Sequence, residues 1–136
     1  MAGYSGTPLV KKLGIKPGCR LALLHAPPDF AETLGMLPAD TTVVRSLRAP
    51  CDVLVYFTKR RAALTKDFAR LMHSLQPDGG LWIAWPKKTS GVTTDLTENV
   101  IRGRALANGL VDNKVCAIDE VWSGLRLAVR VKDRPK

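Results

Sequence analysis

The sequence predicts an α/β fold, a three-layer sandwich with a mostly parallel sheet and an antiparallel strand at the C-terminus. The first observation is that strand-sized apolar runs alternate with helical segments along most of the chain. The second is that the last two apolar runs are joined by a short loop, which is typical of an antiparallel pair at a sheet edge. The third is length: 136 residues without a repeat or linker suit one domain spanning residues 1–136.

The N-terminal segment predicts a short helix followed by the first strand. Thr7 supplies a hydroxyl cap, and Pro8 suits the first helical position because proline has no amide hydrogen to leave unpaired there. Gly14 is a natural end for this helix. Residues 19–24 are mostly apolar and follow a Pro-Gly turn, so we expect a buried strand.

A second short helix and two further strands are expected next. Asp29 and Glu32 have the spacing of a capping box, in which each side chain accepts from a backbone amide at the helix start. Gly35 is a natural stop for that helix. The β-branched residues of 41–44 and the apolar run 53–57 predict the second and third strands.

The middle of the chain carries the clearest helical pattern. Its apolar residues recur at steps of three and four and form one stripe, made of Leu64, Phe68, Leu71, Met72 and Leu75. His73 falls off this stripe and is expected to face solvent. Residues 76–80, Gln-Pro-Asp-Gly-Gly, predict a turn, and residues 81–85 predict the fourth strand.

The last third predicts a helix and the antiparallel strands. Residues 95–108 form the helix, with Asp95 and Glu98 as a cap pair. Residues 115–118 and the alternating run 125–131 predict two strands joined by a short loop. Together these elements describe a Rossmann-like fold, which places ligands beyond the carboxyl ends of its parallel strands.

Composition favours an ordinary globular protein. Hydrophobic residues make up 46% and charged residues 24% of the chain. No apolar run approaches the ~20 residues that span a bilayer, so we expect no membrane segment. Residues 1–6 lack the pattern of a signal peptide, and a cytoplasmic location is the simplest expectation.

Cysteine and histidine give no sign of a metal site. Cys19, Cys51 and Cys116 are far apart and odd in number, and the two histidines are not spaced as ligands. We therefore expect three core cysteines and no bound metal. The net charge of +9 favours phosphates, nucleic acids or anionic surfaces, although the cations are spread out and form no long basic run.

Three blocks of the chain resemble a family of small bacterial proteins that is known only as a domain of unknown function. The blocks are residues 3–18, residues 85–98 and residues 119–125. The entry into the first strand, the turn at 76–80 and the C-terminal strand pair also resemble a shortened class I S-adenosylmethionine methyltransferase. The resemblance to the small bacterial proteins implies a fold and a bacterial origin but no known activity.

The likeness to methyltransferases departs at the cofactor loop. That family places a glycine-rich turn after the first strand, whereas Pro27 and Pro28 stand here without amide hydrogens. The family's acidic residue after the second strand is replaced by Arg45 or Ser46, and arginine cannot accept hydrogen bonds from ribose. The sequence therefore predicts no cofactor in the usual pose.

Polar residues at the expected strand ends mark the candidate site. Lysines, hydroxyls and glycine backbone there suit an anion, and a helix start nearby would add its positive dipole. The same loop residues could equally be solvated or cap a helix. The candidate ligand-binding residues are His25, Lys59, Lys87, Lys88, Thr89, Ser90, Gly91 and Trp122.

The favoured hypothesis is a non-catalytic module that binds an anionic small molecule or a partner at the strand-end crevice. One alternative is a divergent S-adenosylmethionine-dependent methyltransferase-like enzyme, and another is non-specific nucleic-acid binding. His25 is a candidate general base, because histidine titrates near neutral pH, with Asp29 or Glu120 to orient it. No catalytic set converges, so no catalytic residue is assigned. The edge strand 111–118 could pair with a second copy, but the sequence leaves the oligomeric state open.

Overall fold

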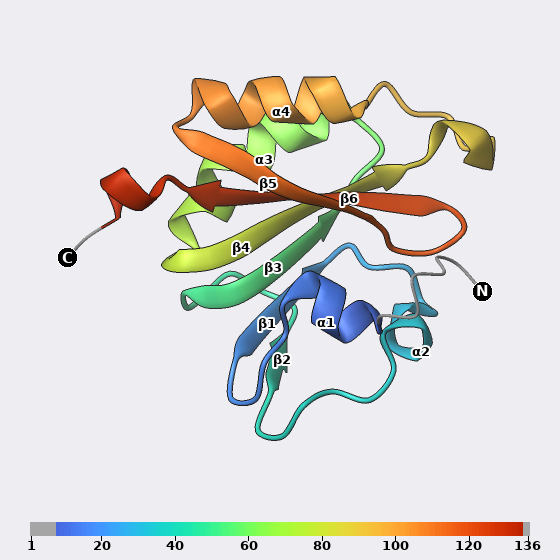
Figure 1. Cartoon of the computed structure of the whole chain (residues 1–136). Helices are drawn as coiled ribbons and strands as arrows, with labels where there is room; N and C mark the ends of the chain where they lie inside the picture. The colour runs from blue at the N-terminus through green and yellow to red at the C-terminus, as the bar shows by residue number, and fades with distance from the viewer. Residues whose placement is uncertain (1–7, 135–136) are drawn as a thin grey trace.

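A six-stranded sheet with helices on both faces organises the chain (Figure 1). The structure is a computed structural model that describes residues 8–134. Its order across the sheet is β2-β1-β3-β4-β6-β5, with β1 to β4 parallel and β6 antiparallel to both β4 and β5. This confirms the predicted Rossmann-like α/β fold. The strands are β1 (Arg20–Leu24), β2 (Thr42–Val44), β3 (Cys51–Phe57), β4 (Leu75–Pro86), β5 (Leu110–Ala117) and β6 (Trp122–Val129).

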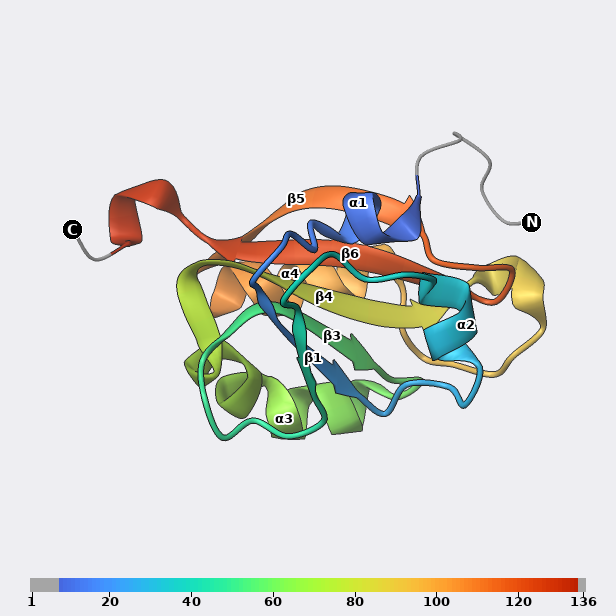
Figure 2. The same ribbon diagram turned by 90° about the horizontal axis from the view of Figure 1, so that it is seen from below.

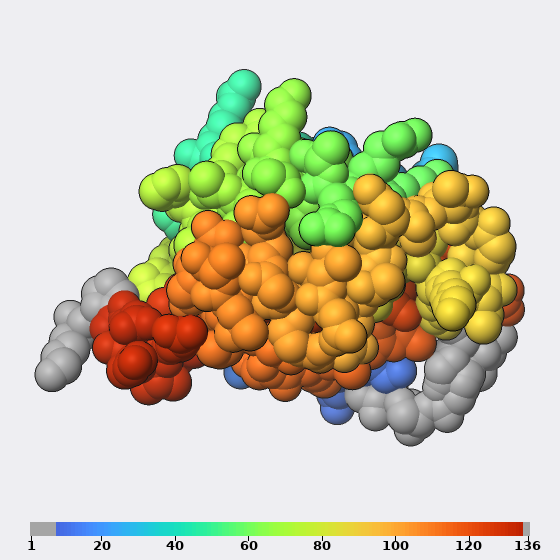
Figure 3. Space-filling view, turned by 90° about the horizontal axis from the view of Figure 1, so that it is seen from above, coloured from blue at the N-terminus to red at the C-terminus, as the bar shows by residue number. Residues whose placement is uncertain are grey.

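The helices cover the two faces unequally. Two longer helices, α3 (Arg61–His73) and α4 (Glu98–Ala107), lie side by side over one face (Figure 3). Two single-turn helices, α1 (Leu9–Leu13) and α2 (Phe30–Leu34), lie on the other (Figure 2). Short 3-10 turns, η1 (Lys88–Ser90) and η2 (Val131–Asp133), follow β4 and β6. No helix within residues 8–134 is long and apolar enough to cross a membrane.

Each face of the sheet has its own apolar core. On the α3 and α4 side, strand residues such as Leu54 and Ile83 pack against the predicted stripe of α3. On the α1 and α2 side, the fully buried Trp82 packs among Leu13, Phe30 and Val55. The indole N–H of Trp82 donates to the carbonyl oxygen of Leu13 at 3.0 Å and so ties α1 to the sheet. His73 is exposed, as predicted.

The turn predicted at residues 76–80 is wrong. Strand β4 already begins at Leu75, and the ladder with β3 jumps from Cys51 opposite Leu75 to Val53 opposite Gly80. Residues 76–79 are therefore an irregular insertion within one long strand. Gly79 is needed for close approach, because a Cβ there would lie 2.8 Å from the carbonyl oxygen of Asp52.

The predicted helix caps also differ from those in the structure. Thr97 caps α4 by accepting from the amide of Val100, so the helix begins after Asp95. Asp95 instead accepts from the amide of Arg61 at 2.7 Å and serves the first turn of α3. Asp29 makes no side-chain cap bond, although α2 follows it. The predicted cap at Thr7 lies outside the described residues.

Strand bounds shift by a few residues where pairing extends a strand. Strand β3 begins at Cys51, whose amide donates to the carbonyl oxygen of Ser74. Strand β5 begins at Leu110, because its first residues pair with the end of β6. Strand β6 is set earlier than the predicted run 125–131, and Val131 lies in η2. The predicted alternation holds in part: Leu125 and Leu127 are buried around the half-buried Arg126, but Ala128 is buried as well.

Candidate functional site

A pocket of about 600 Å³ opens at the carboxyl ends of β1 and β3, the edge where this fold class binds ligands. We call it the strand-end pocket. Its walls come from the turn after β1, the end of β3 with the first turn of α3, and the loops before α4 and β6. The lining residues are 25–28, 57–60, Ala63, Val92, Val121 and Trp122.

The walls of the strand-end pocket are largely apolar. Phe57 is buried and packs edge-on against Trp122, with ring centroids 5.1 Å apart. Pro27 and Pro28 add two apolar rings on the β1 side. Such walls suit a flat, partly apolar ring system, and the volume lies within the range of small-molecule sites.

The polar groups of the pocket are backbone amides and cations. Within residues 8–134, the amide hydrogens of Ala26 and Lys59 have no protein acceptor. Thr58 is buried, and its hydroxyl accepts from the amide of Arg60. Lys59 and Arg60 are exposed at the rim, and none of the lining residues is acidic. The pocket therefore offers hydrogen-bond donors and positive charge.

His25 holds an unusual backbone conformation at the mouth of this pocket. Its φ is +59°, in the left-handed region that glycine adopts most easily. The imidazole lies against Tyr56, with ring centroids 5.4 Å apart. The turn thus supplies a positive φ where the sequence has no glycine, and strained residues of this kind cluster at functional sites.

We expect His25→Gly to be more stable than His25→Ala. Both variants lose the imidazole contact with Tyr56, but only glycine relieves the left-handed backbone. The difference should be about 1 kcal/mol, the reverse of the usual preference for alanine. Urea unfolding of the two variants measures it. An alanine variant as stable as the glycine variant would contradict the strain at this turn.

Tyr56, which packs against His25, connects the end of β3 to α3. Its side chain is fully buried, and its hydroxyl donates to the carboxylate of Asp67 at 2.6 Å. Burial raises the pKa of Tyr56 strongly, and the hydrogen bond to Asp67 raises it further. The phenol is therefore held protonated, which fixes α3 against the end of β3.

We expect Tyr56 to stay protonated in the folded protein at pH 11. A phenol whose pKa is raised on folding stabilises the protein below its unfolded pKa of about 10 and loses that contribution as the pH rises further. The phenolate absorbance of wild type minus that of Tyr56→Phe measures the ionisation. The variant should also lose less stability than wild type above pH ~10. Ionisation of folded Tyr56 near pH 10 would contradict this assignment.

The predicted site residues divide into two groups. His25, Lys59 and Trp122 come together around the strand-end pocket. The loop at 87–91 forms η1 and does not line it, although Val92 directly after it does. The hydroxyl of Ser90 donates to the carbonyl oxygen of Lys87 and accepts from the amide of Val92, so it is used within the loop. The outlying residues are Lys87, Lys88, Thr89, Ser90 and Gly91.

The loop between β4 and α4 is fastened back to the end of β3. The hydroxyl of Thr94 donates to the carbonyl oxygen of Lys59 at 2.6 Å. Asp119 likewise organises the turn before β6, accepting from the amides of Val121 and Trp122 at 2.8 Å each. These polar residues position the pocket walls. Sequence patterns gave no sign of the apolar lining by Val92, Ala63 and Val121.

The pocket fits only part of S-adenosylmethionine, the cofactor of the methyltransferases that the sequence resembles. Its apolar walls, and the amides that have no acceptor among the described residues, suit an adenine ring, and its volume suits a nucleoside. The ribose hydroxyls find no carboxylate acceptor, because none lines the pocket and Arg45 and Ser46 follow β2. The family's usual pose is therefore not supported. Among residues 8–134 no three metal-ligating side chains come together either.

Comparison with solved structures connects the fold to methyltransferases. A protein assigned as a type 11 methyltransferase from Sulfolobus solfataricus matches with a TM-score of 0.55 at 9% identity, over 86% of this chain and 88% of that one. TrmN from Thermus thermophilus matches with a TM-score of 0.51 at 14% identity, over 89% of this chain and 47% of that one. LepI in complex with S-adenosylmethionine matches with a TM-score of 0.50 at 11% identity, over 91% and 47%. This chain spans about half the length of TrmN and LepI.

At these identities the likeness shows the fold alone. No family model and no curated protein sequence matches the chain. The predicted likeness to a family of small bacterial proteins accordingly has no match behind it and stays a prediction. The leading functional prediction, a non-catalytic binding module, is corrected: the structures of this fold include a methyltransferase assignment and a complex with S-adenosylmethionine, which favour the enzyme alternative.

Proposed function

We propose that the chain is a divergent methyltransferase-like enzyme that holds an S-adenosyl cofactor in the strand-end pocket. The observation that carries this proposal is the pocket itself, about 600 Å³ in size and set at the carboxyl ends of β1 and β3. The shared fold of an assigned methyltransferase supports it.

The adenosine part of the cofactor would be held by shape and backbone. Trp122 offers a flat aromatic surface, and Pro27 and Pro28 offer apolar ones. The amides of Ala26 and Lys59, which have no acceptor among the described residues, offer donors to ring nitrogens. This replaces the carboxylate and glycine loop that the family uses. Because those groups are missing, we derive no methyl-transfer step from this geometry.

The charge of the pocket predicts which form of the cofactor binds better. Lys59 and Arg60 lie at the rim, and no lining residue is acidic. The positive sulfonium of S-adenosylmethionine is disfavoured there, whereas S-adenosylhomocysteine lacks that charge. We therefore expect the demethylated form to bind at least as tightly as the methylated one.

Isothermal titration calorimetry of the chain with both compounds tests the proposal, with adenosine as the matched control. We expect saturable binding of one equivalent, with a Kd below about 1 mM. Adenosine should bind more weakly, because it lacks the amino-acid portion. Absence of heat with both S-adenosyl compounds at millimolar concentration would remove the enzyme hypothesis in this form.

A further inference from the structure

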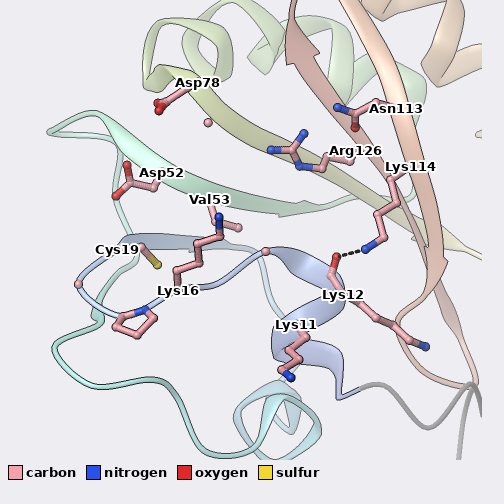
Figure 4. Close-up of a pocket in the computed structure, with 14 residues that line it drawn as sticks. Lys11, Lys12, Lys16, Cys19, Asp52, Val53, Asp78, Asn113, Lys114 and Arg126 are labelled. Carbon is pink, nitrogen blue, oxygen red and sulfur yellow. Dashed lines mark hydrogen bonds between the residues drawn. The ribbon is translucent and has the colours of Figure 1, made fainter.

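A second cavity of about 580 Å³ lies at the opposite end of the sheet, at the amino ends of the parallel strands (Figure 4). We call it the amino-end cavity. Its walls come from α1 and the turn before β1, from the starts of β3 and β4, and from β5 and β6. Open α/β sheets place their usual ligands at the other end, so a cavity here is separate from the strand-end pocket.

Arg126 lines the amino-end cavity. It projects from β6, where it pairs with Trp82 of β4 and Lys114 of β5, and its side chain is half-buried. Burial lowers the pKa of Arg126, and the charge of Arg134 lowers it further. No carboxylate lies within ion-pair distance of it, since the ion pairs among residues 8–134 involve only Arg70 and Arg102 as cations. A partly desolvated guanidinium thus has no counter-charge among the described residues.

The guanidinium of Arg126 has its seat on Gly80, where a Cβ would collide with it. A Cβ on Gly80 would lie 2.7 Å from Cζ of Arg126 and still closer to its Nε. The arginine plane therefore lies directly against the backbone of β4. This contact places the guanidinium against β4 at the wall of the cavity.

Two ammonium groups complete a basic wall. Lys16 from the turn before β1 and Lys114 from β5 reach into the cavity that holds Arg126 (Figure 4). The ammonium of Lys114 donates to the carbonyl oxygen of Lys12 at 3.0 Å, which holds it in place and leaves further donors free.

The acidic residues that line the cavity do not pair with its positive charges. Asp52 accepts from the backbone amide of Arg20 at 2.8 Å. Asp78 is exposed and lies on the side of the cavity away from Lys114 (Figure 4). Neither forms an ion pair with a lysine or arginine of residues 8–134.

We propose that the amino-end cavity binds a phosphate group, carried either by a free nucleotide or by a single-stranded nucleic acid. One guanidinium and two ammonium groups that line the same cavity suit the negative charge of phosphate oxygens. A bound phosphate would also supply the counter-charge that the half-buried Arg126 lacks. This site is independent of the cofactor pocket and holds whether or not the chain transfers methyl groups.

The first experiment measures binding of a short fluorescently labelled single-stranded RNA by anisotropy at low salt. The variant carries Lys16→Gln with Arg126→Gln, and its charge-matched control carries Lys66→Gln with Lys132→Gln, two exposed lysines that do not line the cavity. We expect the first pair to weaken binding at least about tenfold and the control pair to weaken it much less. Unlabelled ADP and pyrophosphate serve as competitors: displacement by them identifies a free phosphate ligand, and displacement by RNA alone identifies a strand.

A second variant tests the seat without changing charge. Gly80→Ala should push the guanidinium of Arg126 off β4 and weaken binding several-fold, while Lys16 and Lys114 keep their charges. Thermal unfolding shows whether each variant is folded. If the double variant is unfolded, the affinity of the single variant Lys16→Gln tests the proposal instead. The proposal fails if the wild-type protein at about 1 mM does not bind the labelled RNA. It also fails if the cavity variants bind the RNA with the same affinity as the control variant.

Discussion

Replacing Ala63 with tryptophan is expected to weaken binding of S-adenosylhomocysteine at least about tenfold. Ala63 lies in the first turn of α3 and lines the strand-end pocket. An indole there would fill much of a pocket of about 600 Å³ and occupy the space assigned to the adenine ring. Calorimetry measures the loss of affinity.

The neighbouring residue supplies a matched control. Ala62 lies in the same turn of α3 but is exposed and does not line the pocket. Ala62→Trp therefore adds the same side chain to the same helix and should leave affinity within about twofold of wild type. If both variants bind with wild-type affinity, the ligand lies elsewhere. If both lose affinity to the same extent, the substitutions have a general effect on α3.

Trp82→Ala is expected to lower the free energy of unfolding by about 3–5 kcal/mol. The side chain is fully buried in the core beneath α1 and α2, and it donates a hydrogen bond to Leu13. Its removal leaves a cavity and an unpaired carbonyl oxygen in α1. Urea unfolding measures the change.

Two further variants separate the contributions of Trp82. Trp82→Phe keeps most of the apolar contact and loses the N–H donor, so it should cost about 1–2 kcal/mol. Leu106→Ala truncates a side chain that is 48% exposed and should change stability by less than about 1 kcal/mol. A cost of Trp82→Ala no greater than that of Leu106→Ala would contradict the assigned role in the core.

The order and type of the elements could be predicted from local patterns. The stripe through Leu64, Phe68 and Leu71 predicts α3 because helical spacing brings these residues to one face, and that face packs on the sheet. Gly14 and Gly35 predict helix ends, and both have positive φ values there. The antiparallel end of the sheet followed from two apolar runs without a helix between them.

The errors arise where contacts between distant segments decide the local structure. Asp95 has a helix-capping pattern, yet its carboxylate serves α3, whose Arg61 is distant in sequence. Residues 76–80 have turn composition, yet pairing with β3 extends β4 through them. Neither partner can be identified from a local window, because both depend on the order of strands in the sheet.

The candidate site was predictable in part for the same reason. Strand ends are recognisable in the sequence, and they gave His25 and Lys59. The loop after β4 was expected at the site, but its path through η1 takes Lys88 away from the pocket lining. The seat of Arg126 on Gly80 depends on the register between β4 and β6, which composition does not reveal.

Nuclear magnetic resonance titration of the isotope-labelled chain with S-adenosylhomocysteine tests the central claim most directly, because it reports both binding and place. We predict saturable shifts of the amides of Ala26 and Lys59 and of the indole of Trp122, which belong to the strand-end pocket. The amide of Lys16, in the amino-end cavity, should stay unshifted. No shifts at millimolar ligand, or shifts confined to the amino-end cavity, would contradict the proposal of a cofactor site at the carboxyl ends of the strands.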